Sequence, residues 1–114
     1  MFLRSWKKNM DSKKEIYEIE FTEEARDEIR EIYEYISKNL VNEDAAKRLM
    51  GKMRKNIMDL AEVPKIYVAI EKKDRMKREF RRMVVDNFII LYTIDENKKT
   101  IYISHMYYGR RNYL

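Results

Sequence analysis

The sequence predicts a small α+β domain: an N-terminal strand, a helical hairpin and then a three-stranded antiparallel meander, with the helices packed on one face of the sheet. Three observations predict it. Two stretches carry apolar residues at helical spacing, several short stretches show strand patterns, and the links between them are short. Because the chain has 114 residues, one domain is expected, over residues 15–114.

The first strand and the first helix are expected in direct succession. Residues 16–21 put Tyr17, Ile19 and Phe21 on one face and Ile16, Glu18 and Glu20 on the other, as in a half-buried strand. Thr22 then offers a hydroxyl as helix N-cap, and Glu23 and Glu24 follow where the helix dipole favours negative charge. The helix itself is predicted from an apolar stripe made of Ala25, Ile29, Ile32, Ile36 and Leu40.

A second helix is expected after a short interruption at residues 39–42. Asn42 repeats the cap, two acidic residues follow it, and apolar residues recur at helical spacing over 46–61. The helix should end near Glu62, because Pro64 lacks an amide donor and biases its predecessor away from helix. The short link makes the two helices an antiparallel hairpin.

The strands of the meander are expected at residues 79–85, 88–94 and 100–108, separated by turn sequences. The middle run is apolar on both faces and is therefore predicted to be a central strand. Residues 66–70 have the pattern of a short strand, whereas the charged residues 71–78 are expected to form an exposed loop.

Composition excludes several kinds of site. The chain has no Cys, one His and two Gly, so disulfides, thiolate nucleophiles, zinc-thiolate sites and glycine-rich phosphate loops are not expected. We therefore predict no cofactor and no metal. No run approaches the ~20 apolar residues of a membrane span, and the opening residues lack the apolar core of a signal peptide. A cytoplasmic location is expected.

The positive charge is concentrated in the second half of the chain. Residues 1–62 hold 13 basic and 14 acidic side chains, whereas residues 63–114 hold 12 and 6. Such an asymmetry indicates an anionic partner, nucleic acid being the commonest, although a solvated basic surface would explain it equally well.

Basic and aromatic residues gather at two places that antiparallel pairing can bring together. Arg supplies a fixed fork of donors for phosphate, and Tyr can stack on a splayed base. These residues are Lys77, Arg78, Arg81 and Arg82 at the first strand of the meander, and Tyr107, Tyr108, Arg110, Arg111 and Tyr113 at the end of the last.

Three segments together resemble the RelE/ParE toxins of prokaryotic toxin-antitoxin operons. They are YEIEFTEEARDEIREIYEYI, FRRMVVDNFIILYTID and IYISHMYYGRRNY, which occur in the family's order over roughly residues 15–114. Residues 1–14 precede this region as a polar, basic extension, for which disorder is one alternative.

The resemblance implies a toxin that arrests growth and is neutralised by an acidic antitoxin encoded beside it, a system also associated with plasmid stabilization. The RelE-like branch is a ribosome-dependent endoribonuclease that binds and cleaves mRNA and so inhibits translation, whereas the ParE-like branch poisons DNA gyrase. Of these, the sequence favours the metal-independent ribonuclease. The alternatives are a non-enzymatic gyrase inhibitor and an inactive toxin-fold partner of an antitoxin.

The resemblance also implies roles for individual residues. Catalytic roles fall on Arg82 and Arg111, which would stabilise phosphate charge, and on Tyr113, which would position a base or a proton. Phosphate or RNA binding falls on Arg81, Arg110, Lys77, Arg78 and Tyr108. Approximate candidates for a general base are Glu71 and Glu79.

Several of these residues also have a plainer interpretation. His105 is predicted to share a strand face with Ile101, Ile103 and Tyr107, where a hydrogen-bonded, partly buried role is favoured over a catalytic one. Arg81 and Arg82 should point to opposite faces, and one of them could pair with a helix carboxylate such as Glu28 or Glu31. The pair Arg110 and Arg111 could bind an acidic antitoxin segment instead of RNA.

Overall fold

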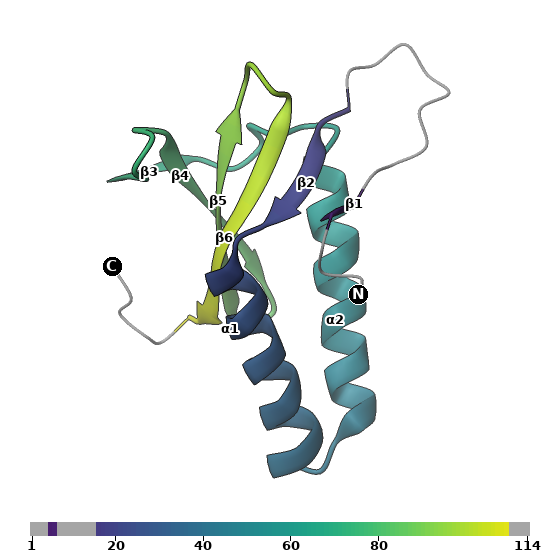
Figure 1. Ribbon diagram of the computed structural model, residues 1–114. Coiled ribbons are helices and arrows are strands. Elements are labelled where there is room, and N and C mark those ends of the chain that lie inside the picture. Colours follow the sequence, from purple (N-terminus) through teal and green to yellow (C-terminus); the bar gives the residue numbers. More distant parts are fainter. Residues whose placement is uncertain (1–4, 7–15, 110–114) are drawn as a thin grey trace.

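The computed structural model describes residues 5–6 and 16–109, which form one twisted sheet with two helices on one side of it (Figure 1). The strands are β1 (Ser5–Trp6), β2 (Glu18–Phe21), β3 (Ala69–Lys73), β4 (Glu79–Val85), β5 (Phe88–Asp95) and β6 (Thr100–Tyr108). The helices are α1 (Glu23–Glu34), which continues into the π-helical segment η1 (Tyr35–Asn39), and α2 (Glu43–Leu60). The predicted α+β fold is confirmed.

The strands follow the spatial order β1-β2-β6-β5-β4-β3. Strands β3 to β6 form an antiparallel meander, whereas β2 pairs in parallel with β6 and is connected through the two helices to β3. Two residues of the expected N-terminal extension, Ser5 and Trp6, pair with β2 as a short antiparallel strand. The apolar strand β5 is central, as its sequence predicts.

Both helices begin at the caps that the sequence predicts. The Thr22 hydroxyl accepts the amide hydrogen of Ala25 at 3.1 Å and donates to the carbonyl of Ser104 at 3.0 Å. The Asn42 side chain accepts the amide hydrogen of Ala45 at 3.0 Å. Thr22 therefore both starts α1 and ties it to β6.

The charged segment after residue 70 differs from the prediction. Residues 71–73 belong to β3, which pairs with β4, so the meander has four strands and the turn between β3 and β4 is confined to residues 74–78. The expectation of an exposed loop over 71–78 was wrong for these three residues. The physical reason is that an edge strand is solvated on its outer side and tolerates charged side chains.

A β-bulge in β6 changes which side chains share a face. Leu91 pairs with His105, but the next residue of β5, Tyr92, pairs with Ile103, so Ser104 is an extra residue. The bulge keeps Ile103 in the core under the helices and turns His105 to the other face, beside the Phe80 ring. The prediction that His105 shares a face with Ile101 and Ile103 was therefore wrong.

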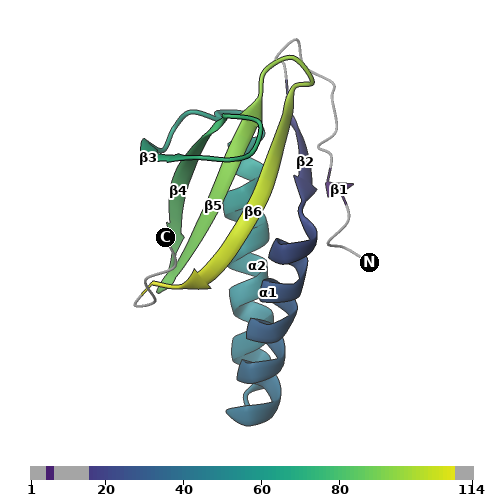
Figure 2. The same cartoon turned by 60° about the vertical axis from the view of Figure 1, so that its left-hand side comes forward.

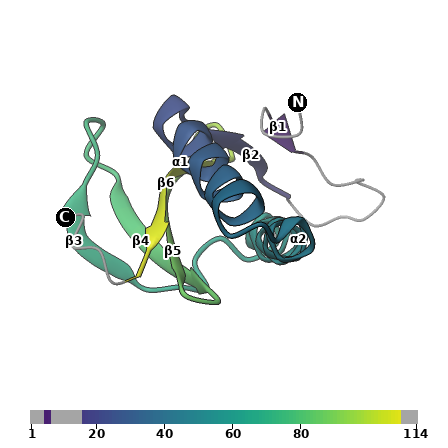
Figure 3. The same ribbon diagram turned by 90° about the horizontal axis from the view of Figure 1, so that it is seen from below.

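The main core is built from residues of both helices and of the sheet, and Figures 2 and 3 show the two helices on the same side of the sheet. Its fully buried members include Ile29 of α1, Ile57 of α2, Met83 of β4, Ile90 of β5 and Ile103 of β6. No helix in residues 16–109 combines the length and the apolar character needed to cross a membrane.

Candidate functional site on the open face of the sheet

The sheet face opposite the helices, here called the open face, carries a small apolar cluster built only from strand residues. Its buried members are Phe80 of β4, Leu91 of β5 and Tyr107 of β6. Because alternate residues of a strand point the same way, Arg82 and Val84 share this face with Phe80. On the open face, the exposed guanidinium of Arg82 thus lies beside an aromatic surface.

Arg81 and Arg82 point to opposite faces, as predicted, and have different roles in the structure. Arg81 lies on the helix side, where its Nη1 donates to the carbonyl oxygen of Tyr67 at 2.6 Å. Arg81 therefore pairs with a backbone carbonyl, whereas the sequence had suggested a carboxylate of a helix as the partner of one of the two arginines. Arg82 is exposed and forms no ion pair with the described residues, so its guanidinium is available to an anion.

The turn between β3 and β4 is held together by Arg78. Its Nε donates to Asp74 at 2.8 Å, its Nη1 lies 3.5 Å from an oxygen of Asp95, and its guanidinium stands over the Tyr102 ring at 4.7 Å. Arg78 and two amide hydrogens keep the pKa of Asp74 low despite the opposing effect of burial. Arg78 is thus engaged by carboxylates, whereas the exposed Lys77 adopts a positive φ of 62° in the turn.

His105 contacts a carboxylate of α1 across the bulge. Its Nδ1 lies 3.4 Å from Oε1 of Glu28, and the same oxygen accepts the amide hydrogen of Met106 at 3.0 Å. This interaction with Glu28 raises the pKa of His105, against the effect of burial, and the negative charge of Glu24 adds to it. His105 is partly buried, as predicted.

The two tyrosines at the end of β6 lie on different faces. Tyr107 is buried on the open face, where burial raises the pKa of its hydroxyl and the positive charge of Arg82 opposes that rise. Tyr108 points to the helix side, where its ring meets the Phe88 ring edge to face at 5.7 Å. Only Tyr107 can therefore act together with Arg82.

A polar groove of about 440 Å³ crosses the open face between the β3–β4 turn and the start of α1. Its lining includes Lys73, Arg75 and Arg78 on the turn side, and Phe80, Tyr102 and His105 on the sheet. Carboxylates balance much of this positive charge, because Asp74 binds Arg78 and Glu28 faces His105. The groove is thus polar without being strongly cationic.

The candidates for a general base do not join Arg82. By strand alternation, Glu79 lies on the face that carries Arg81, and Glu71 lies on the outermost strand, β3. Glu28 borders the open face but already accepts from Met106 and faces His105. Predicted residues Arg110, Arg111 and Tyr113 lie outside the described residues. The described part of the open face offers the exposed Arg82 to an anion, and the exposed Glu24 at the start of α1 is a further carboxylate that lines its groove.

Comparison with known proteins places the chain in a family. Residues 19–113 match the model of the ParE toxin of the type II toxin-antitoxin system parDE. A solved structure of the chromosomal ParDE toxin-antitoxin system from P. aeruginosa has the same fold, with a TM-score of 0.63 and 14% sequence identity over 82% of this chain and 96% of that one. No curated protein matches. Since the family model spans nearly all of the sequence, the chain belongs to the ParE toxin family of type II toxin-antitoxin systems.

Proposed function

We propose that this toxin arrests growth by binding DNA gyrase and that an antitoxin encoded beside it neutralises it. The observation that carries the proposal is the match of residues 19–113 to the ParE toxins, because the ParE-like branch of the resembled family poisons gyrase. An inhibitor of this kind needs a binding surface and no acid-base set of its own.

The geometry of the open face supports this proposal over a hydrolytic one. Cleavage of RNA by its own 2′-hydroxyl needs a group that accepts the hydroxyl proton, cations for the phosphoryl oxygens and an acid for the leaving oxygen. Of the cations predicted to bind phosphate or RNA, Arg78 is bound by Asp74 and Arg81 by the carbonyl of Tyr67. Two of the predicted RNA-binding cations are therefore held in structural contacts.

A metal-independent endoribonuclease is the second candidate, and one specific arrangement favours it. Arg82 is exposed beside Tyr107, and His105 is held by Glu28 on the same face. The reaction needs a cation for phosphate charge and an acid for the leaving oxygen, and on this alternative Arg82 and His105 would take these two roles. On this alternative, Arg111 and Tyr113 would complete the site.

Controlled expression in bacterial cells tests the toxin assignment itself. Induction of the wild-type protein should stop growth, and co-expression of the protein encoded in the adjacent reading frame should restore it. Growth that continues at normal rate despite abundant folded protein would instead support an inactive toxin-fold partner of the antitoxin.

Arg82→Ala separates the two candidate targets in the same cells. The exposed Arg82 forms no ion pair among the described residues, so its removal should leave the fold intact. The ribonuclease alternative requires the variant to lose toxicity together with mRNA cleavage. Toxicity accompanied by relaxed plasmid DNA and intact mRNA would favour gyrase.

A further inference from the structure

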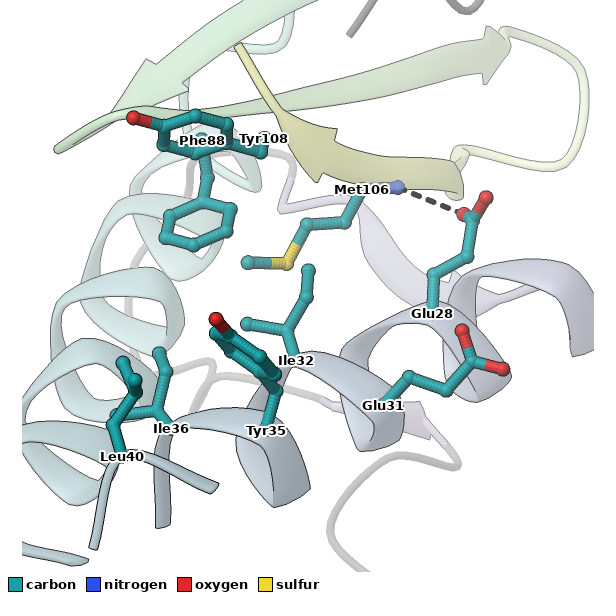
Figure 4. Close-up of a pocket in the computed structure, with 9 residues that line it drawn as sticks. All are labelled: Glu28, Glu31, Ile32, Tyr35, Ile36, Leu40, Phe88, Met106 and Tyr108. Carbon is teal, nitrogen blue, oxygen red and sulfur yellow. Dashed lines mark hydrogen bonds between the residues drawn. The ribbon is translucent and has the colours of Figure 1, made fainter. Parts of the chain in front are cut away.

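The two helices that cover the sheet carry opposite charge. α1 holds six acidic and two basic residues, and two of its carboxylates, Glu28 and Glu31, border the apolar groove shown in Figure 4. α2 holds three acidic residues, all in its first or last turn, and five basic residues between them. The stretch 45–58 of α2 therefore has no negative charge and five positive ones, which belong to Lys47, Arg48, Lys52, Arg54 and Lys55.

These five cations, here called the basic face, lie on the side of α2 that is turned away from the core. At about 100° per residue they fall within an arc of about 160°, and all five are exposed. Figure 3, which looks along α2, shows that one side of this helix faces neither α1 nor the sheet. The middle of the arc is opposite the buried side of the helix, which is formed by Ala46, Leu49, Met53, Ile57 and Leu60.

Carboxylates of the protein neutralise the basic face only in part. Lys52 meets Asp86 at 3.2 Å, whereas Lys47 and Lys55 each approach an acidic residue of the same helix only at 3.8 Å. Arg48 forms no ion pair with the described residues. Like charges three or four positions apart, such as Arg48, Lys52 and Lys55, destabilise a helix. Helix stability therefore does not explain the basic face, which leaves positive charge available to an anionic partner.

Gly51 lies near the middle of the basic face. An added Cβ would meet no atom within 4 Å, and the φ of Gly51 is not positive, so neither packing nor backbone conformation requires a glycine here. Glycine inside a helix lowers stability relative to alanine. What glycine provides is a gap among long side chains, through which another molecule can approach the helix backbone closely.

We propose that the basic face binds duplex DNA without regard to sequence, with α2 in the major groove and Gly51 at the point of closest approach. The inference goes beyond the proposed function, in which the partners of the toxin are proteins. It gives the toxin a direct contact with the DNA on which gyrase acts.

The arrangement of the basic face fits the major groove. An α-helix with its side chains is about 10–12 Å across, and the major groove of B-DNA is about 12 Å wide. Viewed down the helix axis, Lys47 and Arg54 lie on one side of Gly51. Arg48 and Lys52 lie on the other side, so each row of cations can meet one phosphate wall of the groove.

The same geometry favours DNA over double-stranded RNA. The major groove of A-form RNA is deep and too narrow for side chains to read, so a helix cannot enter it as it enters B-DNA. Contacts of Lys and Arg with phosphate oxygens carry no sequence information. Binding is therefore expected to depend on the form of the duplex and on salt, and not on base sequence.

Fluorescence anisotropy of a short labelled DNA duplex, titrated with the full-length toxin in the absence of gyrase and antitoxin, tests the proposal. The wild type should bind, and the logarithm of its affinity should fall linearly with the logarithm of the salt concentration. Arg48→Gln combined with Lys55→Gln should weaken binding roughly tenfold or more and reduce that slope by about two. The matched control, Lys72→Gln combined with Lys98→Gln, removes the same charge from exposed positions in β3 and the β5–β6 turn. It should bind within about twofold of wild type.

Gly51→Gln tests the close approach separately from the charge. The substitution leaves the net charge unchanged and places a better helix former in open space, so the temperature of thermal unfolding should rise. DNA binding should nevertheless weaken several-fold, because the new side chain fills the gap in the basic face. Unchanged DNA affinity in this variant would overturn the placement of Gly51 at the contact.

Failure of the folded wild type to bind duplex DNA, or an equal loss in the α2 variant and its control, would overturn the inference. Duplex RNA that binds as tightly and depends on the same residues would also overturn it. An α2 variant that keeps its DNA affinity and loses affinity for the antitoxin would assign the basic face to the antitoxin instead. Inhibition of gyrase by a wild-type toxin that binds no DNA would leave the proposed function standing.

Discussion

His105 Nδ1 lies 3.4 Å from Glu28 Oε1, and this contact joins the bulge of β6 to the middle of α1. Because Oε1 also accepts the amide hydrogen of Met106, one carboxylate organises both the backbone and the imidazole at the bulge. This arrangement determines on which face of the sheet each of the last residues of β6 lies. His105 and Tyr107 lie on the open face, and Met106 lies in the core.

This contact makes stability depend on pH in a defined direction. Glu28 raises the folded-state pKa of His105 above the ordinary 6.5. Below pH 6.5 His105 is protonated in both states and its contribution to the free energy of unfolding is fully present; that contribution is lost as pH rises through the folded-state pKa. Urea unfolding should therefore show His105-dependent stability that falls as pH rises above 6.5.

The single histidine makes the titration direct to measure. The imidazole resonance in NMR spectra should titrate above pH 6.5 in the folded protein, and Glu28→Gln should lower that pKa while its amide oxygen still accepts from Met106. A folded-state pKa at or below 6.5 in the wild type would contradict the account.

The buried hydroxyl of Tyr92 should contribute to stability. It donates to the carbonyl oxygen of Pro64 at 2.8 Å, and burial raises the pKa of Tyr92 to about 12. Tyr92→Phe should lower the free energy of unfolding by about 1 kcal/mol, because the Pro64 carbonyl loses its donor. Tyr33→Phe, on the partly exposed side of α1, should change it by less than about 0.5 kcal/mol. Equal effects in chemical denaturation would be inconsistent with this role.

Much of the fold follows from local sequence signals, as the caps show. Thr22 and Asn42 start their helices with side-chain hydrogen bonds, and the apolar stripe of α1 buries Ala25 and Ile29. The apolar strand β5 is central. These features depend on residues within a few positions of one another, so the pattern of the chain determines them.

The features that the sequence did not reveal depend on pairing between distant segments. The bulge at Ser104 is set by the register of β6 against β5, and residues 71–73 become a strand only because β4 lies beside them. The role of Glu28 could not be read from its position among the many acidic residues of α1. Glu28 and His105 are 77 positions apart in the sequence, and only the folded chain brings the carboxylate and the imidazole together.

The link between the helices stores backbone strain that a substitution can release. Val41 has a positive φ of 48°, which is costly for a β-branched residue, and its side chain is 85% exposed. Val41→Asn should raise the free energy of unfolding by about 1 kcal/mol, because Asn tolerates this conformation. Val68→Asn serves as the control, since Val68 is also exposed and has a negative φ. A stability gain at Val68 equal to that at Val41 would refute the strain explanation.

The proposed target is tested most directly by assaying one preparation of purified toxin in two reactions side by side. One reaction measures supercoiling of plasmid DNA by gyrase, and the other measures cleavage of mRNA on translating ribosomes. The account predicts that the toxin inhibits gyrase, that the antitoxin reverses the inhibition, and that the mRNA stays intact. Cut mRNA with unimpaired supercoiling would contradict it and would assign the activity to the ribonuclease alternative centred on Arg82.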